Sequence, residues 1–318
     1  MNWFTKAFTS SLGRKWVMSL SGLFMCLFLV VHVSGNFQLF KDDAGYAFNT
    51  YTVFMIHNPI IKTISYLLYA TILIHIIQSL VLTLQNRAAR PQPYTYNKPE
   101  KSSTWSSRNM GILGTVLLVF LVIHFADFWF KYKFGEVKYK NYYSIKYEGE
   151  THIFYSKDSA ESYHKMYSAE GVFIQKIKSK GIDLQDREMM QKLQAENPGM
   201  MQQLQQEFTA FSSNYIGPEE IKTEAVKDLY LEVKLAFQQP LYVIFYLLAL
   251  LALSYHLVHG FQSAWQSIGV HHRKYVPVIK AFGWFFSIVI PAGFAAMPIY
   301  FLLDYMNHDG LLDWSRFF

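Results

Sequence analysis

Five long apolar stretches are the feature that most constrains what this chain can fold into. A helix needs about 20 apolar residues to cross a bilayer, and five stretches of the 318-residue sequence reach that length. Tryptophan and tyrosine gather at their edges, as is typical of helices that end at a membrane interface. The sequence therefore predicts five membrane-spanning helices, over residues 16–40, 60–84, 110–130, 241–268 and 276–303.

Charge divides the chain into two unlike parts. Residues 131–238 carry 15 Lys/Arg and 16 Asp/Glu, a density normal for water-soluble protein, whereas the rest of the chain carries only 14 and 7. A wholly soluble globule and a disordered chain are both excluded. We expect an all-α membrane protein with helices 1–3 in residues 1–130, a polar insertion in 131–238, and helices 4 and 5 with the tail in 239–318. Within the insertion, 184–211 looks helical, with a break at Pro198.

The short loops indicate the orientation in the membrane. Five lysines and arginines against one glutamate lie in the loop 85–109, and Arg273 and Lys274 lie in the loop 269–275. By the positive-inside rule these loops and the N-terminus are cytoplasmic, and the insertion and the C-terminus lie outside. The net charge of +6 thus reflects topology, not a nucleic-acid partner. The single cysteine, Cys26, excludes a disulfide framework, a cysteine zinc site and a cysteine-ligated iron–sulfur cluster within this chain.

Each of the first four apolar stretches contains histidine, which is expensive inside a membrane and marks a candidate functional site. His32 lies 17 residues after Lys15, and His124 lies 16 after Arg108, so both lie about 24 Å above the inner boundary. His75 and His256 each lie 16 residues after the proline that starts their stretch, about 24 Å below the outer boundary. Depth therefore predicts two level pairs. We name them the first pair (His32 and His124) and the second pair (His75 and His256).

Each pair comes from two helices that run in the same direction, which are diagonal neighbours in an up–down four-helix bundle. A diagonal pair of histidines facing across a bundle is the geometry of bis-histidine haem ligation, so the first four helices are predicted to form a bundle that binds two b haems. Zinc is the rival metal, but a structural zinc site needs four converging ligands. His259 follows His256 by three residues and is either an alternative ligand or a partner for a haem propionate.

Several motifs make the sequence resemble a known family. Helix 1 reads Ser19-Leu-Ser-Gly before His32, helix 4 has Gly260 four residues after His256, and the loop contains Leu84-Gln-Asn-Arg-Ala-Ala-Arg90 and later Trp105-Ser-Ser-Arg-Asn-Met110. These segments are similar to the cytochrome b membrane anchor of succinate dehydrogenase and fumarate reductase, in the five-helix, two-haem, single-polypeptide class and its Bacteroidetes branch. The resemblance covers residues 10–130 and 240–303, and the insertion 131–238 departs from it.

The resemblance implies a bacterial inner-membrane subunit of a succinate:quinone oxidoreductase. A flavoprotein subunit with FAD and an iron–sulfur subunit would dock on the cytoplasmic side, and electrons would pass through two haems to menaquinone or ubiquinone. The same resemblance implies that Ser19 contacts a propionate of the outer haem. Arg14, Arg108 and Arg273 would neutralise propionates of the inner haem or meet the iron–sulfur subunit, although positive-inside anchoring explains these charges equally well. Where some fumarate reductases of the class carry a glutamate this chain has Ser254, which favours succinate dehydrogenase.

Quinone chemistry also moves protons, so an acid–base group is needed near one haem. Asp127 is the acidic residue that lies well inside an apolar stretch, one turn after His124, and we predict that it exchanges protons at an outer quinone site. Asp42, Asp43 and His57 are weaker candidates. The alternative for Asp127 is an ordinary ion pair with Lys131 at i+4.

Two other functions remain open at this stage. One is a two-haem cytochrome b that serves another quinone-linked dehydrogenase. The other is a proton-coupled transporter that uses histidine and aspartate as a proton relay, although such transporters show internal repeats with interrupted helices, and no such repeat is evident.

Overall fold

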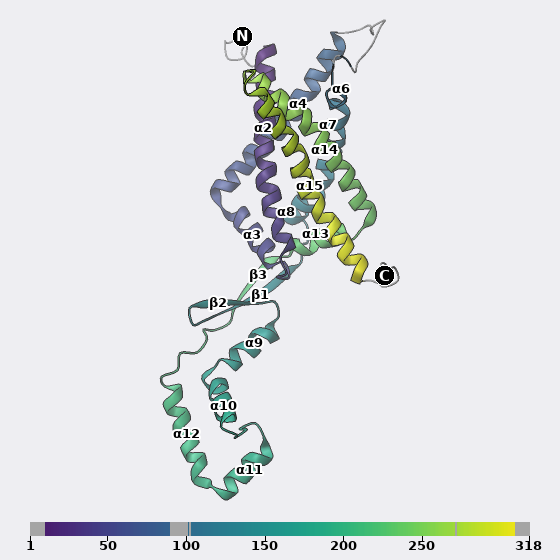
Figure 1. Cartoon of the computed structure of the whole chain (residues 1–318). Coiled ribbons are helices and arrows are strands. Elements are labelled where there is room, and N and C mark those ends of the chain that lie inside the picture. Colours follow the sequence, from purple (N-terminus) through teal and green to yellow (C-terminus); the bar gives the residue numbers. More distant parts are fainter. Residues whose placement is uncertain (1–9, 90–100, 102, 271, 309–318) are drawn as a thin grey trace. The chain divides into compact units, whose positions relative to one another are not determined.

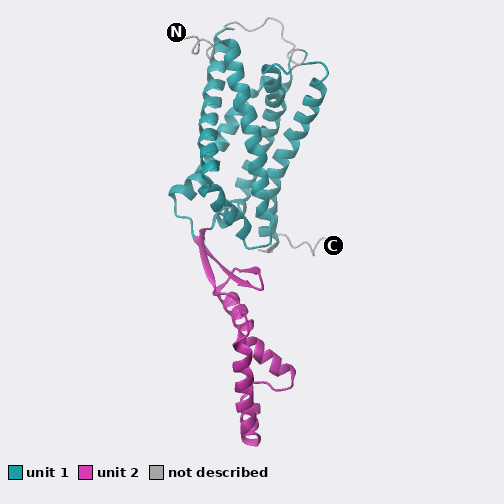
Figure 2. Cartoon of the chain, turned by 90° about the vertical axis from the view of Figure 1, so that its left-hand side faces the viewer, with its two compact units in different colours: residues 1–138, 228–318 teal, residues 139–227 magenta. Residues whose placement is uncertain are grey.

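A computed structural model describes residues 10–89, 101, 103–270 and 272–308 (Figure 1). It separates into two compact units, residues 1–138 with 228–318 and residues 139–227 (Figure 2). Part of the charge that indicates orientation, at Arg90, Lys98 and Glu100, lies outside the described residues.

The first unit contains five helices long and apolar enough to cross a membrane, as the sequence predicts. Prolines begin two of them, and Asn58 caps one by accepting hydrogen bonds from the backbone N–H groups of Ile60 and Ile61. The third helix continues as a π-helix and a last α-turn, beyond the predicted end at residue 130. The elements are α2 (Ser11–Asn36) with η1 (Phe37–Phe40), α4 (Pro59–Ala88), α7 (Met110–His124) with η2 (Phe125–Phe130) and α8 (Lys131–Phe134), α14 (Pro240–Ser267) and α15 (Val276–His308).

Four of these helices form a ring. α2 packs along α4 and along α14, and α14 packs along α7. The ring is completed between α4 and η2, where the Tyr69 ring lies 6.0 Å from that of Phe125 and 5.6 Å from that of Trp129, centroid to centroid. Consequently α2 lies opposite α7, and α4 lies opposite α14. α15 packs outside the ring, against α14 and α2.

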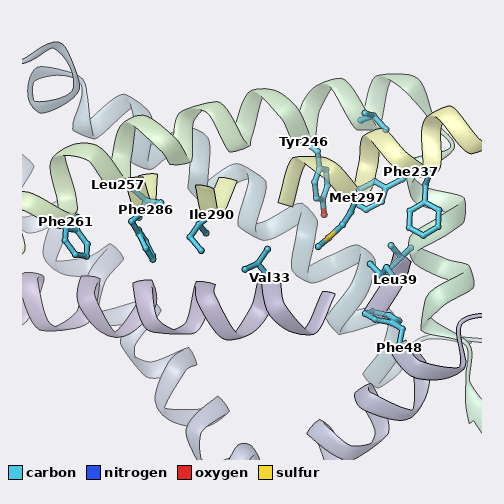
Figure 3. Close-up of a cluster of buried hydrophobic side chains, with 13 residues drawn as sticks. Val33, Leu39, Phe48, Phe237, Tyr246, Leu257, Phe261, Phe286, Ile290 and Met297 are labelled. Carbon is cyan, nitrogen blue, oxygen red and sulfur yellow. The ribbon is translucent and has the colours of Figure 1, made fainter. Parts of the chain in front are cut away.

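The apolar core lies where α2, α14 and α15 meet. Val33, Tyr246, Ile290 and Met297 point into it, and Phe237 covers one end (Figure 3). By contrast, α4 leaves a row of large apolar side chains exposed, as expected of a surface that faces lipid. The row consists of Ile60, Ile64, Leu67, Leu73, Ile77, Leu80 and Leu84.

Two short helices close one end of the four-helix ring, α3 (Tyr46–His57) and α13 (Leu229–Phe237). A third short helix, α6 (Trp105–Arg108), precedes α7. Asn49 joins α3 to α13, because its Nδ2 donates to Asp228 Oδ1 at 2.8 Å and its Oδ1 accepts from the Tyr230 N–H at 2.9 Å. Gly45 enters α3 with φ of +83°, and the Tyr230 ring occupies the space that a Cβ there would need. The two helices are therefore held by buried polar bonds as well as by apolar contact.

The second unit corrects the all-α prediction, because it contains a three-stranded antiparallel sheet of order β2-β1-β3. The β1–β2 hairpin turns at Glu148 and Gly149, both with positive φ, which is the two-residue turn that matches strand twist. Tyr142 and Ile145 of β1 are buried. Tyr147 donates its hydroxyl proton to Tyr215, whose own proton goes to the Tyr167 carbonyl, and this bond holds the pKa of Tyr147 above its ordinary value. The strands are β1 (Tyr139–Tyr147), β2 (Glu150–Phe154) and β3 (Lys222–Lys227).

Four helices complete the second unit. Ser156, Ser168 and Asp186 cap three of them through side-chain bonds to backbone N–H groups. The predicted helical stretch 184–211 is confirmed, and it breaks at Asn197, directly before Pro198. The helices are α9 (Lys157–Met166), α10 (Ala169–Ser179), α11 (Arg187–Glu196) and α12 (Pro198–Ser212).

Candidate functional site

Two pairs of histidine side chains lie between opposite helices of the four-helix ring. His32 of α2 and His124 of α7 have ring centroids 5.9 Å apart. His75 of α4 and His256 of α14 have centroids 6.4 Å apart. These are the pairs that depth along the helices predicts. It is the ring of His256 that lies against His75, while His259 lies further along α14.

The two pairs lie at different levels of the ring. A Cβ built on Gly22 of α2 would lie 3.6 Å from Cε1 of His75, so Gly22 marks the level of the second pair. His32 follows Gly22 by ten positions on the same helix, which separates the levels by about 15 Å along the axis.

A serine contacts one ring nitrogen of His75. Ser21 Oγ lies 3.0 Å from the Met18 carbonyl and 2.9 Å from His75 Nδ1. When the single proton of Ser21 goes to the carbonyl, Ser21 accepts a hydrogen bond from Nδ1–H of His75. Nε2 of His75 then has the free lone pair, which is the state of a histidine that binds a metal.

Tyr246 plays the corresponding part for the first pair. Its hydroxyl lies 2.8 Å from Nδ1 of His124, and its ring is packed against Phe120 and Phe237 in the core. In the second pair, Nδ1 of His256 is buried and has no hydrogen-bond partner. One histidine of each pair is thus held by a side chain of a neighbouring helix of the ring.

The ring separations are suited to a metal ion held between the two histidines of each pair. A metal ion lies about 2 Å from each imidazole nitrogen, which places the centres of two ligating rings about 6 Å apart, close to the two observed separations. Within the described residues no group of three or more His, Cys, Asp or Glu side chains converges, so each pair offers two ligands. A macrocycle that brings four nitrogens of its own needs only two ligands from protein.

Asp127 lies in the π-helix η2, directly after α7. Tyr242 of α14 donates a hydrogen bond of 2.5 Å to its Oδ2. The alternative prediction for Asp127, an ion pair with Lys131, is wrong, because Lys131 forms its ion pair with Glu232 of α13. π-Helical turns are rare and occur frequently at functional sites.

The three arginines predicted to contact propionates lie on different elements of the structure. Arg14 bonds the side chain of Gln85, Arg108 donates to the Ser103 carbonyl, and Arg273 is exposed in the turn before α15. Ser19 is buried on α2, two residues before Ser21. Their roles, and that of His259, stay predictions.

Two of the three weaker proton-exchange candidates make hydrogen bonds with nearby backbone. Asp43 accepts from the backbone N–H groups of Gly45 at 3.1 Å and Ala47 at 2.9 Å, which caps α3. His57 Nδ1 lies 2.8 Å from the Val53 carbonyl of its own helix, and Asp42 is exposed.

Asp43→Ala should lower the free energy of unfolding by about 1 kcal/mol, because the first turn of α3 loses its cap. Thermal unfolding in detergent measures the loss, and Asp42→Ala is the matched control that should change nothing. Unchanged stability in Asp43→Ala, together with slower quinone-linked turnover, would instead favour proton exchange at this carboxylate.

Sequence reasoning missed Ser21, Tyr242 and Tyr246. Ser21 lies in the motif before His32, but the histidine that it contacts is His75. The two tyrosines, four residues apart on α14, look like ordinary interfacial aromatics in the sequence. Their spacing places both on one face of the helix, which is the only signal that could have linked them.

No protein-family model matches the sequence, and no curated protein or solved structure matches it significantly.

Proposed function

We propose that this chain is the membrane anchor and quinone-reactive subunit of a succinate:quinone oxidoreductase. Two bound b haems would supply one-electron transfer between a partner iron–sulfur subunit and quinone. The observation that supports two haems is the presence of two histidine pairs, on opposite helices and at two levels, with ring separations suited to a metal between them. The choice of a succinate:quinone oxidoreductase among haem-containing membrane subunits rests on the resemblance of the sequence.

The residues of the chain have distinct parts in this function. His32 and His124 would hold one haem, and His75 and His256 the other. Ser21 supports the assignment of His75, because a ligand histidine usually donates its second N–H to a protein group. Gly22 lies next to His75. A larger side chain at this position would approach the imidazole of His75, so glycine leaves room there for a flat macrocycle.

Asp127 would supply the acid–base chemistry that a quinone requires. Reduction of a quinone takes up two protons, and a carboxylate beside the first pair is suited to that exchange. Its position in a π-turn and its bond to Tyr242 support a role beyond a surface charge. The menaquinone or ubiquinone would then react near the first pair.

The orientation and the partners are part of the same proposal. The N-terminus and the loop between α4 and α7 would face the cytoplasm of a bacterium, where flavoprotein and iron–sulfur subunits dock. The polar unit 139–227 would lie outside the inner membrane. Apart from its five apolar helices, this arrangement rests on charge in the loops and on the resemblance of the sequence.

A spectrum of the purified full chain tests the proposal. We expect a reduced-minus-oxidised difference spectrum of b haem, two haems per chain, and low-spin electron paramagnetic resonance signals of bis-histidine ligation. Absence of haem from well-folded protein would overturn the proposal and leave the proton-coupled transporter as the remaining candidate function. A chain that holds two haems but co-purifies without a flavoprotein carrying covalent FAD would instead serve another dehydrogenase.

A further inference from the structure

One face of the β1–β2 hairpin is covered by aromatic residues of α9. Side chains alternate across a strand, and residues paired across antiparallel strands share a face. Tyr147 pairs with Glu150 beside the hairpin turn, and His152 follows Glu150 by two positions, so these three side chains lie on one face. α9 packs on this face, because the Tyr163 ring lies 4.9 Å from that of His152, centroid to centroid.

A cavity opens at the turn end of this face, between the hairpin and α9. Its volume is about 330 Å³, near the lower end of the range for small-ligand sites, which is about 300–1,000 Å³. Within the described residues, its lining combines aromatic rings with two glutamates and contains no lysine or arginine: Tyr147, Glu148, Glu150, His152, Tyr163 and Tyr167.

Contacts within the second unit hold the tyrosines of this cavity in place. The Tyr167 ring lies 4.5 Å from that of Tyr163 and 5.3 Å from that of Tyr147, centroid to centroid. The Tyr147 hydroxyl donates to Tyr215 at 2.8 Å, and the Tyr215 hydroxyl donates to the Tyr167 carbonyl at 2.9 Å. The aromatic wall is therefore formed before a ligand arrives, which lowers the entropic cost of binding.

The two glutamates of the cavity are exposed, and in the part of the chain that the structure describes neither forms an ion pair with a lysine or arginine. Together with His152 they could form a metal site only if their side chains converged. Among the described residues, however, no group of three His, Cys, Asp or Glu side chains does so. Negative charge beside aromatic rings, without converging ligands, suits an organic cation better than a metal ion.

We propose that this cavity is a binding site for a quaternary ammonium group. Such a group has no N–H to donate, so it is attracted to the faces of aromatic rings and does not require converging hydrogen-bond acceptors. Glu148 and Glu150 would add electrostatic attraction from the rim. The site is built entirely from residues 139–227, so the proposal does not depend on haem binding by the first unit.

Isothermal titration calorimetry of the purified full chain with choline, in an uncharged detergent, tests the proposal. We expect saturable binding of choline. Its uncharged counterpart of the same shape, 3,3-dimethylbutan-1-ol, should bind about tenfold more weakly, because it lacks the attraction between cation and ring. Ethanolamine, the primary ammonium counterpart, should also bind more weakly than choline. Absence of saturable choline binding, or binding of either counterpart as tight as that of choline, would overturn the proposal.

Two variants of one tyrosine test the aromatic wall. Tyr167→Leu removes a ring and should weaken choline binding about tenfold. Tyr167→Phe keeps the ring and should bind choline as the wild type does. Wild-type affinity in Tyr167→Leu would overturn the proposal.

Variants of the exposed glutamates keep the proposal testable if Tyr167→Leu does not fold. Glu148→Gln and Glu150→Gln should each weaken choline binding about threefold, as expected of a single exposed charge. Glu224→Gln is the matched control, because Glu224 is also exposed in this sheet but pairs with Tyr142 and so lies on the opposite face from Tyr147. Equal affinities in all three glutamate variants would show that the rim carboxylates do not act on the ligand and would overturn the proposal.

Discussion

His32→Ala should remove one of the two haems and leave the other in place. A b haem has no covalent bond to protein, so its two axial bonds and the packing around it hold it. In the structure, the ring of His32 lies between Phe28 and Phe294, with centroids 5.1 and 5.3 Å away, and no such contact links it to the second pair. We therefore expect haem content to fall from two per chain to one, with one low-spin signal lost.

The matching variant of the second pair, His75→Ala, should remove the other haem. Haem is measured by its pyridine complex against protein concentration, and the remaining low-spin signal identifies which haem persists. His259→Ala is the control for an intramembrane histidine outside the pairs, and it should keep both haems. Loss of a haem in His259→Ala and its retention in His256→Ala would reverse the assignment on α14.

Asn49→Ala should destabilise the protein by about 3 kcal/mol, the largest effect on stability that we expect from a single polar side chain. Asn49 is fully buried, and Asp228 is 7% exposed. Removal of the amide takes a donor from a buried carboxylate, whose hydrogen bonds contribute about 1.5–3 kcal/mol each. It also leaves the Tyr230 N–H without its acceptor, and an unsatisfied buried donor costs about 1–3 kcal/mol.

Thermal unfolding of the full chain in detergent measures this loss, and a decrease of about 5 °C or more in the midpoint is expected. Thr52→Val is a suitable control, because the Thr52 hydroxyl bonds only the Phe48 carbonyl of its own helix. An Asn49→Ala midpoint equal to that of the control would show that α3 and α13 are held by apolar contact alone.

The membrane helices and the histidine pairs could be predicted because both depend on distance along one axis. Length and apolar composition place a helix in the bilayer, and residue number then gives the depth of each side chain. Depth alone was sufficient to pair His32 with His124 and His75 with His256. Their function as ligands stays a prediction.

Contacts that depend on rotation about the helix axis could not be predicted in the same way. Tyr246 reaches His124 because α14 packs beside α7, and no local pattern gives that neighbour. The sheet of the second unit was missed for another reason. In β1, the buried residues Tyr142 and Ile145 are three positions apart, so the strand lacks the strict alternation that identifies one face of a sheet.

The π-turn at residues 125–130 changes the rotation about the helix axis between the two parts of the helix that it joins. A turn closed by i→i+5 bonds contains one residue more than an α-helical turn, so everything after it is rotated relative to His124. Lys131 can therefore face Glu232 while His124 faces the ring interior. The extra residue of the π-turn thus lets one continuous helix present His124 to His32 and Lys131 to α13.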